Sequence, residues 1–239
     1  MCSIKGIIFD YGGTIDTNGI HWGELIWEQY RKEGINIDKE TYRDAYVHGE
    51  RSLAKSPIIA PADTFRTLLQ KKMALQFAYL RERLGNTGTF TEEKEKMVAE
   101  RCYDKAAKTI ETARPLLEAL RERFPMVLVT NFYGNMPVVL REFMLENVFT
   151  TIVESSVVGI RKPDPALFEL GVKALGLRAE ETVVIGDSYR KDIYPAATIG
   201  CRTVWLKKVC WADEPIEKGY EPTAVADTLA LLPEILENI

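Results

Sequence analysis

Residues 7–16 read IIFDYGGTID, and they set the architecture of the whole chain. The apolar run from Ile4 to Phe9 is β-branched and aromatic and ends abruptly at polar and glycine residues, which predicts a buried strand. Asp10 then stands at the carboxyl end of this strand, where open α/β sheets bind their ligands. Gly12 and Gly13 allow a tight turn at this point, although an aspartate followed by glycines is also the ordinary composition of a turn.

Three more groups of polar residues follow the ends of predicted apolar strands further along the chain. They are Thr130-Asn131, Lys162 before Pro163-Asp164-Pro165, and Gly186-Asp187-Ser188 with Asp192. Together with Asp10, and in this order, they resemble the four motifs of the haloacid dehalogenase-like (HAD) hydrolase superfamily. The resemblance covers nearly the whole chain, and four ordered motifs are far more specific than any one of them.

The elements after residue 110 alternate between helix and strand, a pattern that makes a parallel sheet with helices on both faces. Pro115 predicts a break between a helix that runs towards Ile110 and a second helix over residues 116–124. Strands are expected at residues 126–129, 151–154, 182–185 and 203–206 and near Ala224. The sequence therefore predicts an α/β fold with a Rossmann-like parallel sheet core.

Residues 17–110 carry apolar residues at helical spacing and show no strand pattern. They form an all-helical block inserted between residues 1–16 and 111–239, which make up the predicted Rossmann-like catalytic core. A plain helical insertion that only adds stability would have the same pattern. The resemblance implies more, because HAD hydrolases of the first cap type carry a helical cap at this point, which closes over the active site and selects the substrate.

The resemblance assigns catalytic and phosphate-binding roles to the first three motifs. Asp10 is the nucleophile, since a carboxylate that attacks phosphorus forms an aspartyl-phosphate and splits one hard hydrolysis into two easier steps. Thr130 and Asn131 stand on the second motif, where a hydroxyl and an amide can donate hydrogen bonds to a phosphoryl oxygen, although both also suit the start of a turn. Lys162 stands on the third motif, where it would neutralise the nucleophile and the phosphate.

The fourth motif implies a Mg²⁺ cofactor. By the resemblance, Asp187 binds the metal together with Asp10 and the backbone carbonyl of Gly12. This donor set agrees with the preference of Mg²⁺ for one or two carboxylates plus water and phosphate oxygens. Asp192 is expected behind this set, acting through water or by holding Lys162, and it would also suit a helix N-cap.

Gly12 departs from the family pattern. Phosphatases of the superfamily usually carry a second aspartate there, which protonates the leaving group and later activates water, and such catalysis is worth roughly 10²–10⁴-fold. The sequence therefore indicates a Mg²⁺-dependent phosphatase for a small phosphorylated metabolite that uses a substitute acid or a substrate with a good leaving group. His21 is the leading substitute because a histidine exchanges protons near neutral pH, and packing or substrate contact is its alternative role.

Two other functions stay open from the sequence. Phosphonoacetaldehyde hydrolases of the superfamily have alanine at the Gly12 position and use a cap lysine as a Schiff base, and Lys55 lies in the helical block, although its surroundings do not resemble theirs. A protein that binds a phosphorylated ligand or partner and catalyses little belongs to a different class. The combination of Asp10, Lys162 and Asp187 argues against it, because a binding module needs no nucleophile with neutralising partners.

Composition limits the remaining possibilities. The chain has 239 residues and a formal net charge of −4, and it shows no basic stripe of the kind that binds nucleic acid. No apolar run approaches membrane-spanning length and no signal-peptide pattern precedes the first strand. The four cysteines, Cys2 among them, have no metal-ligand or redox spacing, which favours a reducing cytoplasm. The sequence leaves the substrate and the oligomeric state open.

Overall fold

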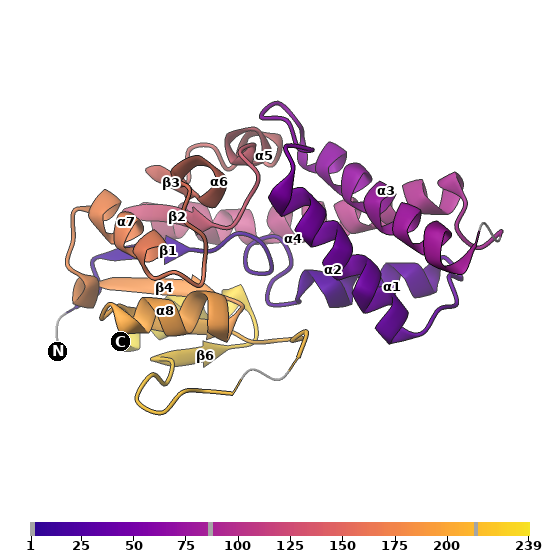
Figure 1. Ribbon diagram of the computed structural model, residues 1–239. Helices are drawn as coiled ribbons and strands as arrows, with labels where there is room; N and C mark the ends of the chain where they lie inside the picture. Colours follow the sequence, from indigo (N-terminus) through magenta and orange to yellow (C-terminus); the bar gives the residue numbers. More distant parts are fainter. Residues whose placement is uncertain (1–2, 86–87, 213–214) are drawn as a thin grey trace.

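The computed structural model describes residues 3–85, 88–212 and 215–239. Its centre is a sheet of six parallel strands in the order β3-β2-β1-β4-β5-β6 (Figure 1). The strands are β1 (Gly6–Phe9), β2 (Met126–Thr130), β3 (Thr151–Glu154), β4 (Thr182–Gly186), β5 (Arg202–Leu206) and β6 (Ala224–Ala226). The predicted α/β fold with a Rossmann-like parallel sheet is confirmed.

Side chains of the central strands point alternately into two hydrophobic cores. In β1, Ile7 and Phe9 lie in the larger core and Ile8 lies in the smaller one. Ile8 is in register with Val127 of β2 and Val184 of β4, and both of these also belong to the smaller core. Because both faces are covered, these strands are continuous apolar runs rather than alternating ones.

Helices cover both faces of the sheet. Side chains of α7 (Ala166–Leu175) and α8 (Tyr194–Thr198) complete the smaller core, whereas α5 (Met136–Glu142) and α9 (Leu232–Asn238) contribute to the larger one. The remaining helical elements of the core are short: α6 (Ser155–Val158), 3₁₀ turns at Ala179–Glu181 and Leu229–Leu231, and a π-helical turn at Tyr189–Ile193.

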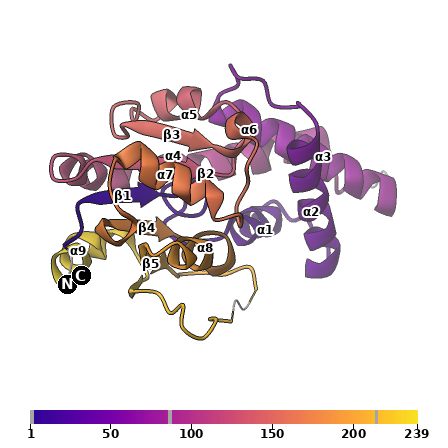
Figure 2. The same cartoon turned by 60° about the vertical axis from the view of Figure 1, so that its left-hand side comes forward.

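The inserted block consists of α1 (Trp22–Lys32), α2 (Lys39–Lys55), α3 (Phe65–Leu84) and the first part of α4 (Glu92–Arg121). The first three helices lie together at one end of the molecule, and α9 and the start of β1 lie at the other (Figures 1 and 2). Asp38 and Thr64 cap α2 and α3, since each side chain accepts a hydrogen bond from a backbone N–H of the first turn. Buried side chains of the block belong to the larger core, so the block and the sheet share one hydrophobic interior.

The predicted helix break at Pro115 is wrong, because α4 (Glu92–Arg121) runs unbroken through this proline. A proline inside a helix costs about 3 kcal/mol. However, α4 continues to bury one face beyond the proline, through Leu117 and Leu120. Each fully buried leucine contributes roughly 1.5–3 kcal/mol, so the continuous buried face outweighs the lost hydrogen bond. The expected boundary between residues 110 and 111 therefore lies inside a helix.

The composition predicts buried or inert free cysteines and no membrane-spanning segment. Cys102 and Cys201 are buried free thiols, and Cys2 lies outside the described residues. Among the helices of the described segments, none has both the length and the apolar character needed to cross a membrane.

Candidate active site

The carboxyl ends of β1, β2 and β4 meet at one edge of the sheet. β1 pairs with β2 on one side and with β4 on the other, so the strand order reverses at this point. Such a switch point is where open parallel sheets bind ligands. A cavity of about 360 Å³ lies there, lined by residues of the strand ends and of the helical block.

All eight residues that the sequence nominates for the site line this cavity. They are Asp10, Gly12, His21, Thr130, Asn131, Lys162, Asp187 and Asp192. Lys55, the candidate for Schiff-base chemistry, is exposed at the end of α2 and is not among the lining residues. The fold thus brings the four sequence motifs into one site and leaves Lys55 outside it.

Lys162 links two of the carboxylates. Its Nζ donates to Asp10 Oδ1 at 2.5 Å and to Asp192 Oδ1 at 2.7 Å, and all three side chains are buried. Burial opposes the charged form of the lysine, but the two neighbouring carboxylates outweigh it and raise the pKa of Lys162. The lysine is therefore a fixed positive charge beside Asp10.

Asn131 holds this lysine in place. Its Nδ2 donates to the carbonyl oxygen of Lys162 at 3.1 Å, and its Oδ1 accepts from the backbone N–H of Lys162 at 2.9 Å. Both polar atoms of the amide are therefore engaged with the lysine backbone. Thr130 is the last residue of β2, is 1% exposed, and lines the same cavity as Asp10, which follows the neighbouring strand β1.

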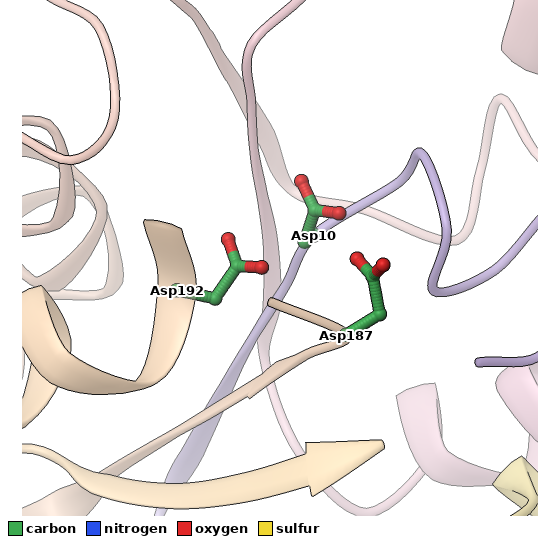
Figure 3. A group of neighbouring side chains, drawn as sticks. All are labelled: Asp10, Asp187 and Asp192. Carbon is green, nitrogen blue, oxygen red and sulfur yellow. The ribbon is translucent and has the colours of Figure 1, made fainter. Parts of the chain in front are cut away.

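Asp10, Asp187 and Asp192 place carboxylate oxygens within 4.8 Å of one another. Figure 3 shows the three side chains converging from the end of β1, the end of β4 and the π-helical turn. Burial raises the pKa of Asp10 to about 6, although Lys162 opposes the shift. Burial, followed by the charges of Asp192 and Asp10, raises the pKa of Asp187 well above its usual range. A divalent cation relieves such crowding of like charges, and three carboxylates suit a hard ion such as Mg²⁺.

Gly13 lets these carboxylates approach the loop after β1. Its φ of +94° lies in the region that favours glycine, and a Cβ atom there would lie 2.3 Å from Asp187 Oδ2. The backbone N–H of Gly13 in turn donates to Asp16 Oδ1 at 2.7 Å. The glycine of the first motif is therefore required both by the turn and by the carboxylate packed against it.

His21 is held in the cavity wall as the N-cap of α1. Its Nδ1 accepts a hydrogen bond from Gly23 N at 3.0 Å, and its ring stacks on Trp211 with a centroid separation of 5.2 Å. Burial, reinforced by the positive charge of Lys191, lowers the pKa of His21 to about 4. The imidazole is therefore neutral near pH 7, and its accepting nitrogen is already occupied.

Sequence reasoning missed two residues of the cavity, Asp16 and Lys72. Asp16 lies in the loop after β1, is 1% exposed, and has a pKa that burial raises to about 7. The signal was a second acidic residue in the same short loop as Asp10. Lys72 comes from α3 and pairs with Glu50 of α2 at 2.7 Å. Nothing in local spacing separates this lysine from Lys71, the adjacent lysine of α3, which pairs with Asp63.

Comparisons with known proteins agree with this geometry. A family model described as haloacid dehalogenase-like hydrolase matches residues 4–200. The chain is 33% identical over 94 residues to a glyceraldehyde 3-phosphate phosphatase of Pyrococcus furiosus, with 39% of each chain covered. It is 35% identical over 104 residues to a phosphoserine phosphatase of Thermus thermophilus, with 42% of this chain and 41% of that one covered. The chain thus spans about two fifths of the length of these curated relatives.

A similarity to solved structures extends over the whole chain. The HAD-family protein YfnB of Bacillus subtilis, solved bound to magnesium, aligns with a TM-score of 0.60 and 20% identity, covering 99% of this chain and 100% of that one. At this identity the comparison establishes the fold alone. The match to the family model extends from the first strand to the end of α8 and includes all four motifs. The chain therefore belongs to the haloacid dehalogenase-like hydrolases.

Proposed function

We propose that this chain is a Mg²⁺-dependent phosphatase that hydrolyses a small phosphorylated metabolite through an aspartyl-phosphate intermediate. One observation carries the proposal: Asp10 is buried at a strand end, bonded to Lys162 and grouped with two further carboxylates. The names of the matched relatives, phosphatases of glyceraldehyde 3-phosphate and of phosphoserine, support the same reaction class.

Asp10 is proposed as the nucleophile, with Lys162 as its neutralising partner. The lysine holds Asp10 Oδ1, and Thr14 Oγ1 donates to Asp10 Oδ2 at 3.2 Å, so the carboxylate is fixed in orientation. Lys162 also offers positive charge to the negatively charged phosphoryl group. Thr130 is proposed to donate to a phosphoryl oxygen. Asn131 is proposed to contribute to phosphate binding as well, and its bonds to Lys162 support a positioning role.

The metal ligands are proposed to be Asp10, Asp187 and the backbone carbonyl of Gly12. Asp192 would support the set from behind, because one of its oxygens is bonded to Lys162 and the other accepts from Ser188 N at 3.1 Å. A bound Mg²⁺ would supply positive charge at the phosphoryl oxygens. Three carboxylates whose oxygens lie within 4.8 Å of one another support this cofactor, because Mg²⁺ prefers oxygen ligands.

Residues 17–110 are proposed to act as a cap that selects the substrate, and residues 1–16 and 111–239 as the catalytic core. The cavity wall contributed by the block includes Lys72, whose pKa Glu50 raises although burial opposes the shift. A buried cation in the same cavity as Asp10 favours substrates that carry a polar or anionic group in addition to the phosphate. A cytoplasmic location and the absence of a nucleic-acid partner stay predictions.

The phosphonate-hydrolase alternative has less support. A Schiff base forms from a neutral lysine, and the cap lysine in this cavity, Lys72, is held in its charged form by Glu50. Lys55 is exposed and lies outside the cavity. A non-catalytic binding role also has less support, because binding alone does not require a nucleophilic carboxylate such as Asp10 beside Lys162 and Asp187.

A panel of substrates tests the proposed function. Phosphate monoesters of sugars, hydroxy acids and amino acids, phosphonates and 4-nitrophenyl phosphate are incubated with the protein, with Mg²⁺ and with EDTA. We expect inorganic phosphate release from at least one monoester in Mg²⁺ and none in EDTA. Turnover of phosphonates alone, or of no compound, would contradict the proposal.

Removal of one proposed ligand should abolish Mg²⁺ binding. We expect isothermal titration calorimetry to show Mg²⁺ binding to the wild type and no measurable binding to Asp187→Ala, because one of two carboxylate ligands is gone. The wild-type affinity should rise with pH, since the raised pKa values of Asp10 and Asp187 mean that protons must leave before the metal binds. Asp38→Asn, which changes an exposed carboxylate at the start of α2, is the control. Equal affinity in wild type and Asp187→Ala would refute this ligand set.

A further inference from the structure

Cleavage of an alkyl phosphate requires a proton donor at the leaving oxygen, and Gly12 has no side chain to supply one. Several titratable residues that line the cavity do not exchange a proton near pH 7 and are therefore unsuited to this task. Burial lowers the pKa of His21 to about 4. Neighbouring carboxylates raise the pKa of Lys72 and Lys162 although burial opposes them, so both ammonium groups hold their protons at neutral pH.

Three further titratable residues of the cavity, Tyr46, Tyr133 and Glu50, do not exchange a proton near pH 7 either. Burial raises the pKa of the phenols of Tyr46 and Tyr133. Lys72 lowers the pKa of Glu50 although burial opposes the shift, so this carboxyl group is ionised at neutral pH. Asp10 and the two carboxylates grouped with it have the roles proposed above.

Asp16 is the remaining carboxylate of the cavity, and its position is fixed by two hydrogen bonds. Oδ1 accepts from Gly13 N at 2.7 Å, and Oδ2 accepts from Trp22 Nε1 at 2.9 Å. Neither oxygen is bonded to a lysine or arginine of the described segments. Asp16 is therefore a buried carboxylate in the loop that carries the nucleophile, without the ion pair that would keep it permanently charged.

The carboxylate of Asp16 lines the same cavity as Gly12 and accepts a hydrogen bond from Trp22, the residue nearest to the open space at position 12. A Cβ atom built on Gly12 would meet nothing closer than the Trp22 ring, whose Cδ1 and Nε1 lie at 4.0 Å. The same Nε1 donates to Asp16 Oδ2. The indole of Trp22 therefore contacts both the open space at position 12 and the carboxylate of Asp16, which lies four residues further along the chain.

The surroundings of Asp16 allow it to hold and to release a proton near pH 7. Burial raises its pKa to about 7, and the hydrogen bonds from Gly13 and Trp22 oppose the shift. The charged and titratable groups that face it are Asp10, Asp187, Lys72, Tyr11 and Tyr46. A general acid that becomes a base in the next step works best with a pKa near the working pH.

We propose that Asp16 is the general acid and base of this active site and takes the place of the carboxylate that position 12 lacks. The inference rests on the phosphatase function proposed above. In the first step, an Asp10 oxygen forms a bond to phosphorus, the bond from phosphorus to the leaving oxygen breaks, and protonated Asp16 gives its proton to that oxygen. In the second step, a water oxygen forms a bond to the phosphorus of the aspartyl-phosphate, the bond from phosphorus to the Asp10 oxygen breaks, and Asp16 takes a proton of the water. Inorganic phosphate leaves, and both aspartates return to their starting states.

Asp16→Asn separates this role from a structural one through the leaving group. We expect kcat/KM for an alkyl phosphate to fall by roughly 10²–10⁴-fold, because the alkoxide leaves without a proton. The first step with 4-nitrophenyl phosphate should fall by less than about tenfold, since nitrophenolate leaves without protonation. Its second step still lacks a base, so the variant should release a burst of nitrophenolate equal to the enzyme concentration and accumulate phosphoenzyme. Asp38→Asn is the matched control and should behave as wild type for both substrates.

A second variant keeps the test valid if Asp16→Asn disturbs the loop. Gly12→Asp in the Asp16→Asn background should recover alkyl phosphate turnover by at least about tenfold, because the new carboxylate enters an open space beside Trp22. Infrared titration in EDTA should show one fewer carboxyl group titrating near pH 7 in Asp16→Asn than in the wild type. Trp22→Phe removes a hydrogen bond to the carboxylate, so it should move that titration to higher pH.

The possible outcomes distinguish the two proposals. If the wild type releases no phosphate from any monoester in Mg²⁺, the phosphatase function itself is wrong. If the wild type is active and Asp16→Asn loses alkyl and aryl turnover equally, without burst or rescue, Asp16 is not the acid and base. Unchanged alkyl phosphate turnover in Asp16→Asn would also overturn the inference.

Discussion

Asp10→Asn should lower kcat/KM for every substrate by on the order of 10⁴-fold or more, because the amide keeps the shape of the carboxylate but is not an anionic nucleophile. Lys162 can still donate to the amide oxygen, and the substitution removes a buried charge from a site with two further carboxylates. The variant is therefore expected to fold. The measurements are phosphate release in Mg²⁺ and mass spectrometry of acid-quenched protein, which should show a phosphoryl adduct in the wild type and none in the variant.

The control for this prediction is Asp38→Asn, in which the same chemical change is made at an exposed helix cap. Asparagine caps helices about as well as aspartate, so the folding and the activity of the control should match the wild type. Turnover by Asp10→Asn within a few-fold of the wild type would contradict the aspartyl-phosphate mechanism.

Lys162→Met is expected to have the largest effect on stability. It removes the only ammonium group bonded to Asp10 and Asp192 in the described segments and leaves two buried carboxylates without their partner. Breaking a buried ion pair in this way costs about 3–5 kcal/mol of unfolding free energy. Lys162→Met should also lose turnover, because Asp10 and the phosphate then lack the positive charge that the lysine offers to both.

The loss of unfolding free energy in Lys162→Met should increase as the pH rises. Without the lysine, the pKa of Asp10 rises above its wild-type value of about 6. When the pKa of a carboxyl group is higher in the folded than in the unfolded protein, its contribution to the free energy of unfolding is fully present below the unfolded-state pKa. This contribution is lost as the pH rises through the folded-state pKa. Urea unfolding in EDTA should therefore show a greater destabilisation at pH 8 than at pH 5. Lys5→Met, which removes a half-exposed partner of Glu181, is the control and should change stability far less. A destabilisation equal at both pH values would contradict the assigned charge balance.

The sequence was sufficient to predict the parallel sheet and to identify most of the residues that line the candidate active site. Parallel strands are buried on both faces, so they appear as continuous apolar runs, and their carboxyl ends necessarily meet at one edge. The polar residues that follow these runs, such as Asp10, Thr130 and Asp187, could therefore be placed together without coordinates. The helical block was also determined locally, since apolar spacing and the caps at Asp38 and Thr64 are short-range signals.

The tertiary structure decided the points that depend on burial. Pro115 is a helix breaker by local rules, yet α4 continues past it because Leu117 and Leu120 extend the buried face of the helix. His21 appears from its type to be a neutral-pH acid, but burial lowers its pKa. Asp16 appears to be one more turn residue until Trp22 and Gly13 enclose it, and Lys72 appears to be a solvated lysine until α2 places Glu50 beside it. The charge state of a side chain follows from desolvation and from neighbours distant in sequence, and neither quantity is encoded in local spacing.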